Sequence, residues 1–221
     1  MGSDLTQVIR KLEEQIVLGR LRPRERLIEE DLVMLFGAKK HVVRQALSEL
    51  ERMGLVVRER NRGAKVQDYS PREVKQIFEV RRLLEAEAAM QIPLPAPEET
   101  VSALKRIYNQ HSDAIDAGDL STAFRANIAF HKTLFGACEN AYLAEAIALF
   151  ALKAHAVRSY SLANKELLLQ ARDEHRQIIK ALERADRDGL VALCIAHLQP
   201  SVEAYISAYE GLLEPGYARS A

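Results

Sequence analysis

The apolar residues near the N-terminus follow a helical period and then change to the alternation typical of strands. Three runs place apolar residues at i, i+3 and i+4 spacing, and each run stops at a glycine, a residue that commonly caps helices. The runs are Leu5–Leu18 before Gly19, about Ile28–Phe36 before Gly37, and Val42–Met53 before Gly54. Two strand-like segments, 55–57 and 64–66, then flank a polar, basic turn at 59–63. Three closely spaced helices and a basic hairpin predict a winged helix-turn-helix.

A second domain is predicted to begin at residue 70. The sequence Ser70-Pro71-Arg72-Glu73 has the pattern of a capping box with proline in the first helical position. From there the pattern is helical and contains no strand. The predicted helices span about 71–91, 98–117, 119–136, 140–161, 164–185 and 187–213. The fold class is therefore mainly α, with a winged domain at 1–69 and, at 70–221, an all-α antiparallel bundle of about six helices around one cavity.

Length and composition narrow the class of protein. The 221 residues suit two domains, since domains of roughly 100–200 residues are usual. Hydrophobic residues make up 48% and charged residues 28%, which excludes an intrinsically disordered or collagen-like chain. Two cysteines are too few for a disulfide scaffold, and no apolar run approaches a membrane span of about 18 residues. We therefore expect a cytoplasmic protein without a membrane partner.

Basic residues are concentrated in the winged domain, although the whole chain has no net charge. Lys and Arg together number 31, as do Asp and Glu. Residues 1–68 hold 14 basic and 11 acidic side chains, and within 36–66 the balance is eight to three. A positive stretch of this kind on a helix-turn-helix indicates contact with the phosphates of DNA.

Four segments of the winged domain resemble, in order, the GntR family of bacterial transcription regulators. They are 19–23 (Gly-Arg-Leu-Arg-Pro), 26–32 (Arg-Leu-Ile-Glu-Glu-Asp-Leu), 43–56 (Val-Arg-Gln-Ala-Leu-Ser-Glu-Leu-Glu-Arg-Met-Gly-Leu-Val) and 62–66 (Arg-Gly-Ala-Lys-Val). The bundle resembles the shorter form of the FCD effector domain found in the FadR-type subfamily. Its matching residues are 80–85 (Val-Arg-Arg-Leu-Leu-Glu), Phe130-His131, Asn140, Glu174-His175, Asp186 and His197. The resemblance covers nearly the whole chain and implies a homodimer that binds operator DNA and a small carboxylate effector.

The start of the predicted third helix carries the residues expected to contact DNA, because recognition helices touch bases and phosphates from their first turns. These residues are Lys39, Lys40, His41 and Arg44, flanked by Arg26 at the second helix and by Arg62 and Gly63 in the wing. The resembled family usually has Ser-Arg-Thr where this chain has Lys39-Lys40-His41. Lysine fits phosphate as well as bases, whereas arginine reads guanine bidentately. Arg44 fills the family's arginine position, and a solvated basic face is the alternative for the cluster.

Three histidines of the bundle are predicted to converge. His131 lies on the third bundle helix, while His175 and His197 lie on the last two. The latter are 22 residues apart, a spacing that suits facing levels of two antiparallel helices. Three imidazoles at one point indicate a divalent metal site, with Zn²⁺ or Ni²⁺ favoured by ligand type.

The predicted metal site departs from the FCD pattern at one position. The pattern has an Asp four residues before its first His, and this chain has Asn127 there, whose amide oxygen is neutral and a poorer ligand. Core histidines held by hydrogen bonds, or a metal-free pocket whose imidazoles bind an acid directly, are the alternatives. Of the remaining bundle histidines, His155 is expected to be structural or to line the pocket, and His111 to lie at the surface.

A carboxylate effector also requires a cation in the pocket. Arg81 on the first bundle helix and Arg158 on the fourth are the candidates, because arginine binds carboxylates through charge-assisted hydrogen bonds. The alternative for each is a surface arginine paired with Glu79 or Glu85.

The leading hypothesis is a ligand-responsive transcription regulator and not an enzyme. We expect a repressor, since release from DNA is the commoner response to an effector in the resembled family. One alternative is a metal-dependent hydrolytic enzyme with His131, His175 and His197 around an open coordination position. Such an enzyme needs a general base, and only Glu174 adjoins a ligand, pointing about 100° away from His175 around the helix. A helical scaffold with an incidental basic patch is a third alternative.

Overall fold

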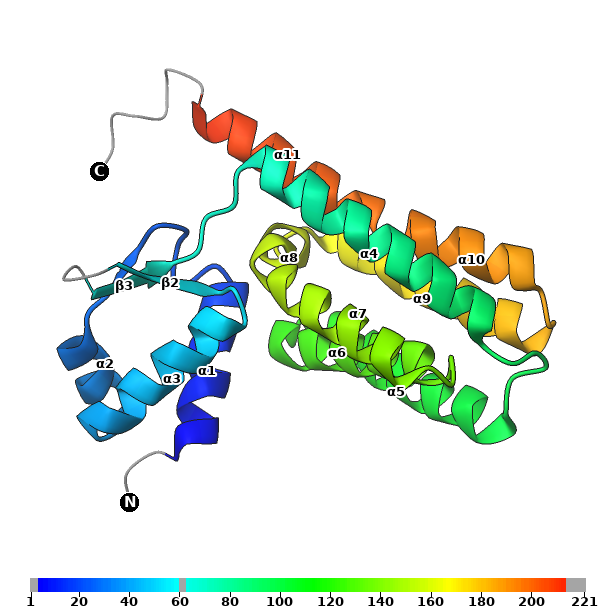
Figure 1. The fold of residues 1–221 in the computed structure, drawn as a ribbon, viewed down its shortest axis with the longest axis horizontal. Helices are drawn as coiled ribbons and strands as arrows, with labels where there is room; N and C mark the ends of the chain where they lie inside the picture. Colours follow the sequence, from blue (N-terminus) through cyan, green and yellow to red (C-terminus); the bar gives the residue numbers. More distant parts are fainter. Residues whose placement is uncertain (1–3, 60–62, 214–221) are drawn as a thin grey trace.

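Three helices and a small sheet form the N-terminal region (Figure 1). The computed structural model describes residues 4–59 and 63–213. The elements of this region are α1 (Leu5–Val17), β1 (Arg26–Leu27), α2 (Glu29–Phe36), α3 (Lys40–Arg52), β2 (Val56–Glu59) and β3 (Gly63–Val66). The apolar faces of the helices close on one another, so that Val8, Leu12, Val43, Leu47 and Leu50 are at most 2% exposed. The predicted winged helix-turn-helix is confirmed.

The sheet contains one strand that the sequence pattern does not predict. β1 pairs antiparallel with β3, which places Arg26 opposite Lys65 and Leu27 opposite Ala64, and β3 pairs in turn with β2. The placement of Arg26 at the second helix is therefore wrong, because that helix begins at Glu29. A strand of two residues has no alternation of its own to detect, so only its partner strand reveals it.

Eight helices form the C-terminal region within the described residues (Figure 1). They are α4 (Pro71–Gln91), α5 (Glu98–Asp116), α6 (Leu120–Gly136), α7 (Ala141–Lys153), α8 (His155–Leu162), α9 (Lys165–Glu183), α10 (Arg187–Ala196) and α11 (Gln199–Leu213). The predicted capping box starts α4: the Ser70 hydroxyl accepts from the Glu73 N–H at 3.3 Å, and Glu73 accepts from the Ser70 N–H at 2.8 Å. α4 packs against α7, α10 and α11, and α5 packs against α6 and α9.

Two of the six predicted helices are each divided in two. The segment 187–213 breaks at His197 and Leu198 because Pro200 follows. Proline lacks an N–H, and its ring clashes with the carbonyl four residues earlier, so α10 ends at Ala196. The segment 140–161 breaks at Ala154, where no proline or glycine occurs. This second break coincides with the packing of α8 against α1 and α11, which is a tertiary effect.

The winged domain and the bundle share one hydrophobic core at their junction. Buried side chains of α1 and α3 cluster there with Val157 of α8 and Val202 of α11. Gly54, at the end of α3, has a φ of +75°, and a Cβ at this position would lie 2.6 Å from the Tyr69 hydroxyl. That hydroxyl donates to the Gly54 carbonyl at 2.9 Å. The two domains therefore meet through packed side chains as well as through the connecting chain.

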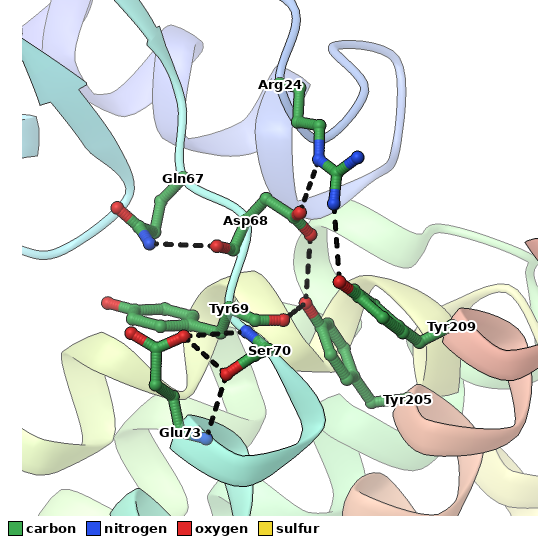
Figure 2. A network of polar contacts seen from close by, with 8 residues as sticks. All are labelled: Arg24, Gln67, Asp68, Tyr69, Ser70, Glu73, Tyr205 and Tyr209. Atoms are coloured by element: carbon green, nitrogen blue, oxygen red, sulfur yellow. Dashed lines mark hydrogen bonds and ion pairs between the residues drawn. The ribbon is translucent and has the colours of Figure 1, made fainter. Parts of the chain in front are cut away.

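A polar network ties the linker to α11 (Figure 2). The Tyr205 hydroxyl donates to the Tyr69 carbonyl at 2.7 Å and lies 3.4 Å from Asp68 Oδ1. Asp68 Oδ2 accepts from Arg24 Nε at 2.6 Å, and Arg24 Nη2 donates to the Tyr209 hydroxyl at 3.3 Å. Through two tyrosines, α11 thus contacts both the linker and the turn that precedes β1.

One helical stretch, Arg187–Glu210, is long and apolar enough to cross a membrane by length and composition alone, with a mean hydropathy of 1.2. In the fold this stretch comprises α10 and most of α11, two helices separated at His197 and Leu198. Both pack against α4 within the bundle. The core helices of soluble proteins pass the same length test, and we interpret the stretch as part of the bundle.

Candidate functional site

The first turns of α3 present a row of exposed polar side chains, as predicted. Lys39 is the N-cap of the helix, and Lys40, His41 and Arg44 follow it on the exposed side. The opposite side of α3 is buried in the domain core, which includes Val43, Ala46, Leu47 and Leu50. Burial of one face fixes the orientation of the helix and leaves its cationic face toward solvent.

Two cations in the first turns of α3 are paired with carboxylates of α2. Lys40 Nζ lies 2.6 Å from Glu30 Oε1, and Arg44 Nε lies 2.8 Å from Glu29 Oε2. The Lys40 and Arg44 side chains remain 50% and 58% exposed, so both pairs are open to water. Exposed ion pairs contribute only about 0–1 kcal/mol, and phosphate oxygens can therefore replace these carboxylates at small cost.

The wing is only partly described. Gly63 begins β3 with a φ of +82°, a left-handed conformation that suits glycine. Arg62 lies outside the described residues, so its predicted role stays a prediction. Arg26 is exposed on β1, beside Lys65 of β3, and thus lies on the sheet that carries the wing.

The three predicted histidines of the bundle do converge. His131 of α6, His175 of α9 and His197 after α10 offer ring nitrogens that all lie within 4.8 Å of one another. The Nε2 atoms of His131 and His197 are 3.1 Å apart. Two nitrogen ligands at about 2.0–2.1 Å from one ion lie roughly 3.0–3.4 Å apart, so this separation suits a shared metal.

The hydrogen bonding of these histidines also fits a metal. His175 is fully buried, and neither of its ring nitrogens has a hydrogen-bond partner among the described residues. Burial lowers the pKa of His131 and of His175 well below the usual range, which keeps both rings neutral and able to coordinate. The residues present are therefore suited to hold Zn²⁺ or Ni²⁺.

Glu174 holds the third histidine in place. Its Oε2 accepts from His197 Nδ1 at 2.5 Å, which directs the Nε2 of that ring toward the other two histidines. Burial alone would raise the pKa of Glu174, but the hydrogen bond from His197 holds it below its usual value. A carboxylate on the distal nitrogen of a ligating histidine fixes the tautomer and raises its basicity. The carboxylate of Glu174 is thus engaged by His197.

A cavity of about 60 Å³ lies beside the histidine cluster. The polar residues around it include Arg81, His111, Asn127, Arg158, Glu174 and His197. Asn127 thus lines the same cavity as His197, one helical turn before His131. The prediction that His111 lies at the surface is wrong, since His111 is 2% exposed and its ring centroid is 5.0 Å from that of His175. Its spacing of seven residues from the buried Leu104 was the available signal.

The two predicted arginines both line this cavity but differ in their pairing. Arg81 is 2% exposed, and its Nη2 lies 2.7 Å from Glu85 Oε1, one turn along α4. The alternative of a surface arginine is therefore wrong, although the pairing with Glu85 is present. Burial, together with the nearby Arg81, lowers the pKa of Arg158 to about 9 against the attraction of Glu85. Arg158 keeps its charge at neutral pH and can bind an acid.

A buried ion cluster lies at the domain junction and was not predicted from the sequence. Glu13 of α1 is 5% exposed, and its Oε2 lies 2.6 Å from Arg125 Nη1 of α6. Its Oε1 lies 3.1 Å from Nδ1 of His155, which begins α8. Of the two roles predicted for His155, structural or pocket-lining, the structure shows the structural one. The available signal was a glutamate on the apolar face of α1, four residues after Ile9 and three before Ile16.

Comparisons with known proteins agree with this architecture. The profile described as bacterial regulatory proteins, gntR family, matches residues 5–66, and the FCD domain profile matches residues 76–200. The HTH-type transcriptional regulator LutR of Bacillus subtilis is 29% identical over 215 residues, covering 86% of this chain and 95% of LutR. The HTH-type transcriptional repressor RspR of Escherichia coli K12 is 25% identical over 201 residues, covering 90% and 87%.

Solved structures share the fold. Escherichia coli McbR/YncC matches with a TM-score of 0.78 at 21% identity, covering 95% of this chain and 100% of that chain. A GntR-type transcriptional regulator from Rhodococcus sp. RHA1 matches with a TM-score of 0.77, also at 21% identity, covering 93% and 98%. The exposed cations of α3 lie within the first profile match and the three histidines within the second. The chain therefore belongs to the GntR family of bacterial transcription regulators and carries an FCD domain.

Proposed function

We propose that this regulator binds its operator as a homodimer and responds to a small carboxylic acid through a divalent metal in the bundle. The proposal rests on two features that occur in the same chain: an exposed cationic face on α3, and three converging histidines beside a cavity. His131, His175 and His197 would hold the ion with Asn127 beside them. A bound Zn²⁺ or Ni²⁺ would supply a Lewis-acidic centre for a carboxylate, and Arg158 a second point of attraction.

The dimer is supported by apolar side chains on the outer face of the bundle. Leu83 and Met90 of α4 are exposed at a spacing of seven residues, as are Tyr142 and Leu149 of α7. α4 and α7 pack side by side, which places these side chains on neighbouring helices. Exposed apolar patches commonly mark protein interfaces. We infer that two copies of this face form the two-fold contact.

Glu174 supports the regulator over a hydrolytic enzyme. A hydrolase would need a carboxylate free to take a proton from a metal-bound water. Glu174 is the carboxylate nearest in sequence to a proposed ligand, and it is hydrogen-bonded to His197. In this position it orients a ligand, as a sensor site also requires.

We expect Arg44→Ala to weaken operator binding by about 1–3 kcal/mol, because a base or phosphate contact from α3 is lost. The measurement is fluorescence anisotropy of the full-length protein on its own upstream DNA, where a short inverted repeat is expected for a two-fold dimer. Arg176→Ala is the matched control, since Arg176 is also exposed and also paired with a carboxylate, at 3.0 Å from Asp173. Equal operator affinity in wild type and Arg44→Ala would remove Arg44 from the contacts.

We expect the purified protein to hold less than one metal ion per chain, because Asn127 is a weaker ligand than aspartate. Asn127→Asp should raise the occupancy measured by elemental analysis, whereas Asn109→Asp, the same change at an exposed position of α5, should not. His175→Ala should reduce both metal content and the rise in melting temperature that added Zn²⁺ or Ni²⁺ produces. If calorimetry detects no binding of either ion, the histidines must be reassigned to the core or to direct acid binding.

A further inference from the structure

The charged groups around the cavity balance one another without an effector. Among the described residues, Arg81 and Arg158 bring two positive charges, and Glu85 and Glu174 bring two negative charges. Glu85 contacts Arg81 directly, and its other carboxylate oxygen is buried without a hydrogen-bond partner. Glu174 is held by His197. The protein therefore offers this cavity no surplus charge of its own.

A divalent ion in the histidine cluster would change this balance by two charges. The three histidines would add no charge of their own, because imidazole coordinates a metal in its neutral form. Asn127 is neutral by its chemistry and stands where an aspartate would cancel one of the two charges. A charge held among buried side chains such as His131 and His175 is costly unless a partner of opposite charge accompanies it. The missing charges must therefore come from the effector.

We infer that the effector is a compact dianion, a short-chain dicarboxylate, and that Asn127 sets this preference over a monocarboxylate. The inference rests on the proposed metal-dependent sensing of an acid. One carboxylate would meet the ion at the histidines, and the other would meet Arg158, which lines the same cavity. The chain must be short, because a cavity of about 60 Å³ has room for only a few water molecules, each of which needs at least roughly 10–15 Å³ by the same measure.

The test compares acids that differ in charge but hardly in shape. Calorimetry on the full-length, Zn²⁺-loaded protein would measure the Kd of malonate and succinate against the Kd of their monoamides, in which one carboxylate becomes a carboxamide. We expect the dianion of at least one pair to bind about tenfold or more tightly than its monoamide. Asn127→Asp should remove most of that ratio because it supplies the missing negative charge, whereas Asn109→Asp should keep it. Arg158→Gln should also reduce the ratio, which gives a second variant on a different helix.

The outcomes separate this inference from the function on which it rests. A monoamide that binds the wild type as tightly as its dianion, or a ratio that Asn127→Asp leaves unchanged, would overturn the dianion preference while keeping metal-dependent acid sensing. If the protein binds Zn²⁺ but none of the four acids, both the dianion preference and the acid-sensing function fail. If the protein binds no metal, the dianion preference also fails, because it depends on the charge of the ion. A ratio that depends on Asn127 and Arg158 supports it.

Discussion

Replacing Glu13 by alanine should lower the free energy of unfolding by about 3 kcal/mol, near the lower end of the ~3–5 kcal/mol range for breaking a buried ion pair. The variant leaves Arg125 and His155 without their shared carboxylate at the junction of the two domains. We expect the lower end because the Arg125 side chain is 28% exposed and can regain water. His155 is only 3% exposed and cannot. The measurement is urea unfolding of the full-length protein, followed by circular dichroism.

Glu14→Ala is the matched control for this variant. Glu14 is the next residue of α1, is only partly buried, and makes no ion pair within the described part of the chain. Its replacement should change stability by no more than about 0.5 kcal/mol. In the background of Arg125→Ala, the loss of Glu13 should cost less than it does alone, since interacting residues are not additive. If the double variant loses as much stability as the two single variants together, Glu13 and Arg125 are not energetically coupled.

The same cluster gives the protein a defined response to acid. Burial would raise the pKa of Glu13, but hydrogen bonds from His155 and Arg125 hold it below the usual 4.5. Its contribution to stability is thus complete above pH 4.5 and is lost as the pH falls through the lowered value. Burial lowers the pKa of His155 below 6.5, partly opposed by Glu13, so the unfolded chain gains a proton first and stability also declines below about pH 6.5. Glu13→Ala should flatten the decline below pH 4.5.

Tyr205→Phe should reduce the effect of an acid on operator affinity from the range of about 5–150-fold, typical of allosteric coupling, toward no effect. His197 stands at the break between α10 and α11, and Tyr205 lies about two turns further along α11. Its hydroxyl contacts the Tyr69 carbonyl of the linker (Figure 2). An acid that binds at His197 would therefore act on the start of α11, and α11 is hydrogen-bonded to the linker through Tyr205. The measurement is operator Kd with and without Zn²⁺ and malonate.

The matched control is Tyr108→Phe in α5, because the Tyr108 hydroxyl has no hydrogen bond with any described residue. This variant should keep the full response. Operator affinity without the acid should stay within about tenfold of wild type for Tyr205→Phe, since one neutral hydrogen bond contributes only about 0.5–1.5 kcal/mol. A Tyr205→Phe protein that keeps the complete response would exclude this tyrosine from the route between the bundle and the DNA.

The sequence predicts the elements and the histidine cluster well, because periodicity and spacing are local properties. His131, His175 and His197 meet as expected, since helical spacing sets which residues share a face. The break before Pro200 was readable from the proline itself, whereas the break at Ala154 has no local signal and follows tertiary packing. Partners across domains, such as Glu13 with Arg125, cannot be paired from one sequence.

Arg81 is unsuitable for testing effector binding by substitution, because it is paired with a buried carboxylate. Its position in the bundle suggests that Arg81→Ala would test effector binding directly. The structure shows that Arg81 neutralises Glu85, which is 1% exposed. Alanine at this position would leave a buried carboxylate without its partner and destabilise the bundle whether or not an acid binds. Arg158 is the better position for that purpose, because it lines the same cavity while the Glu85 carboxylate contacts Arg81.

The carboxylates of α2 have a consequence for the search along genomic DNA. If α3 contacts DNA as we propose, Glu29 and Glu30 occupy, for Arg44 and Lys40, the positions that backbone phosphates would take. Any DNA would have to displace these carboxylates from Arg44 and Lys40. Only the operator would add base contacts in return, so the lost ion pairs would weaken binding to random sequence the most. Internal pairing also means that fewer counterions are released per phosphate contacted, and the salt dependence should fall below the usual slope of about 0.9 per contact. Weak attachment to random sequence shortens each pause, and the regulator samples more of the chromosome in a given time.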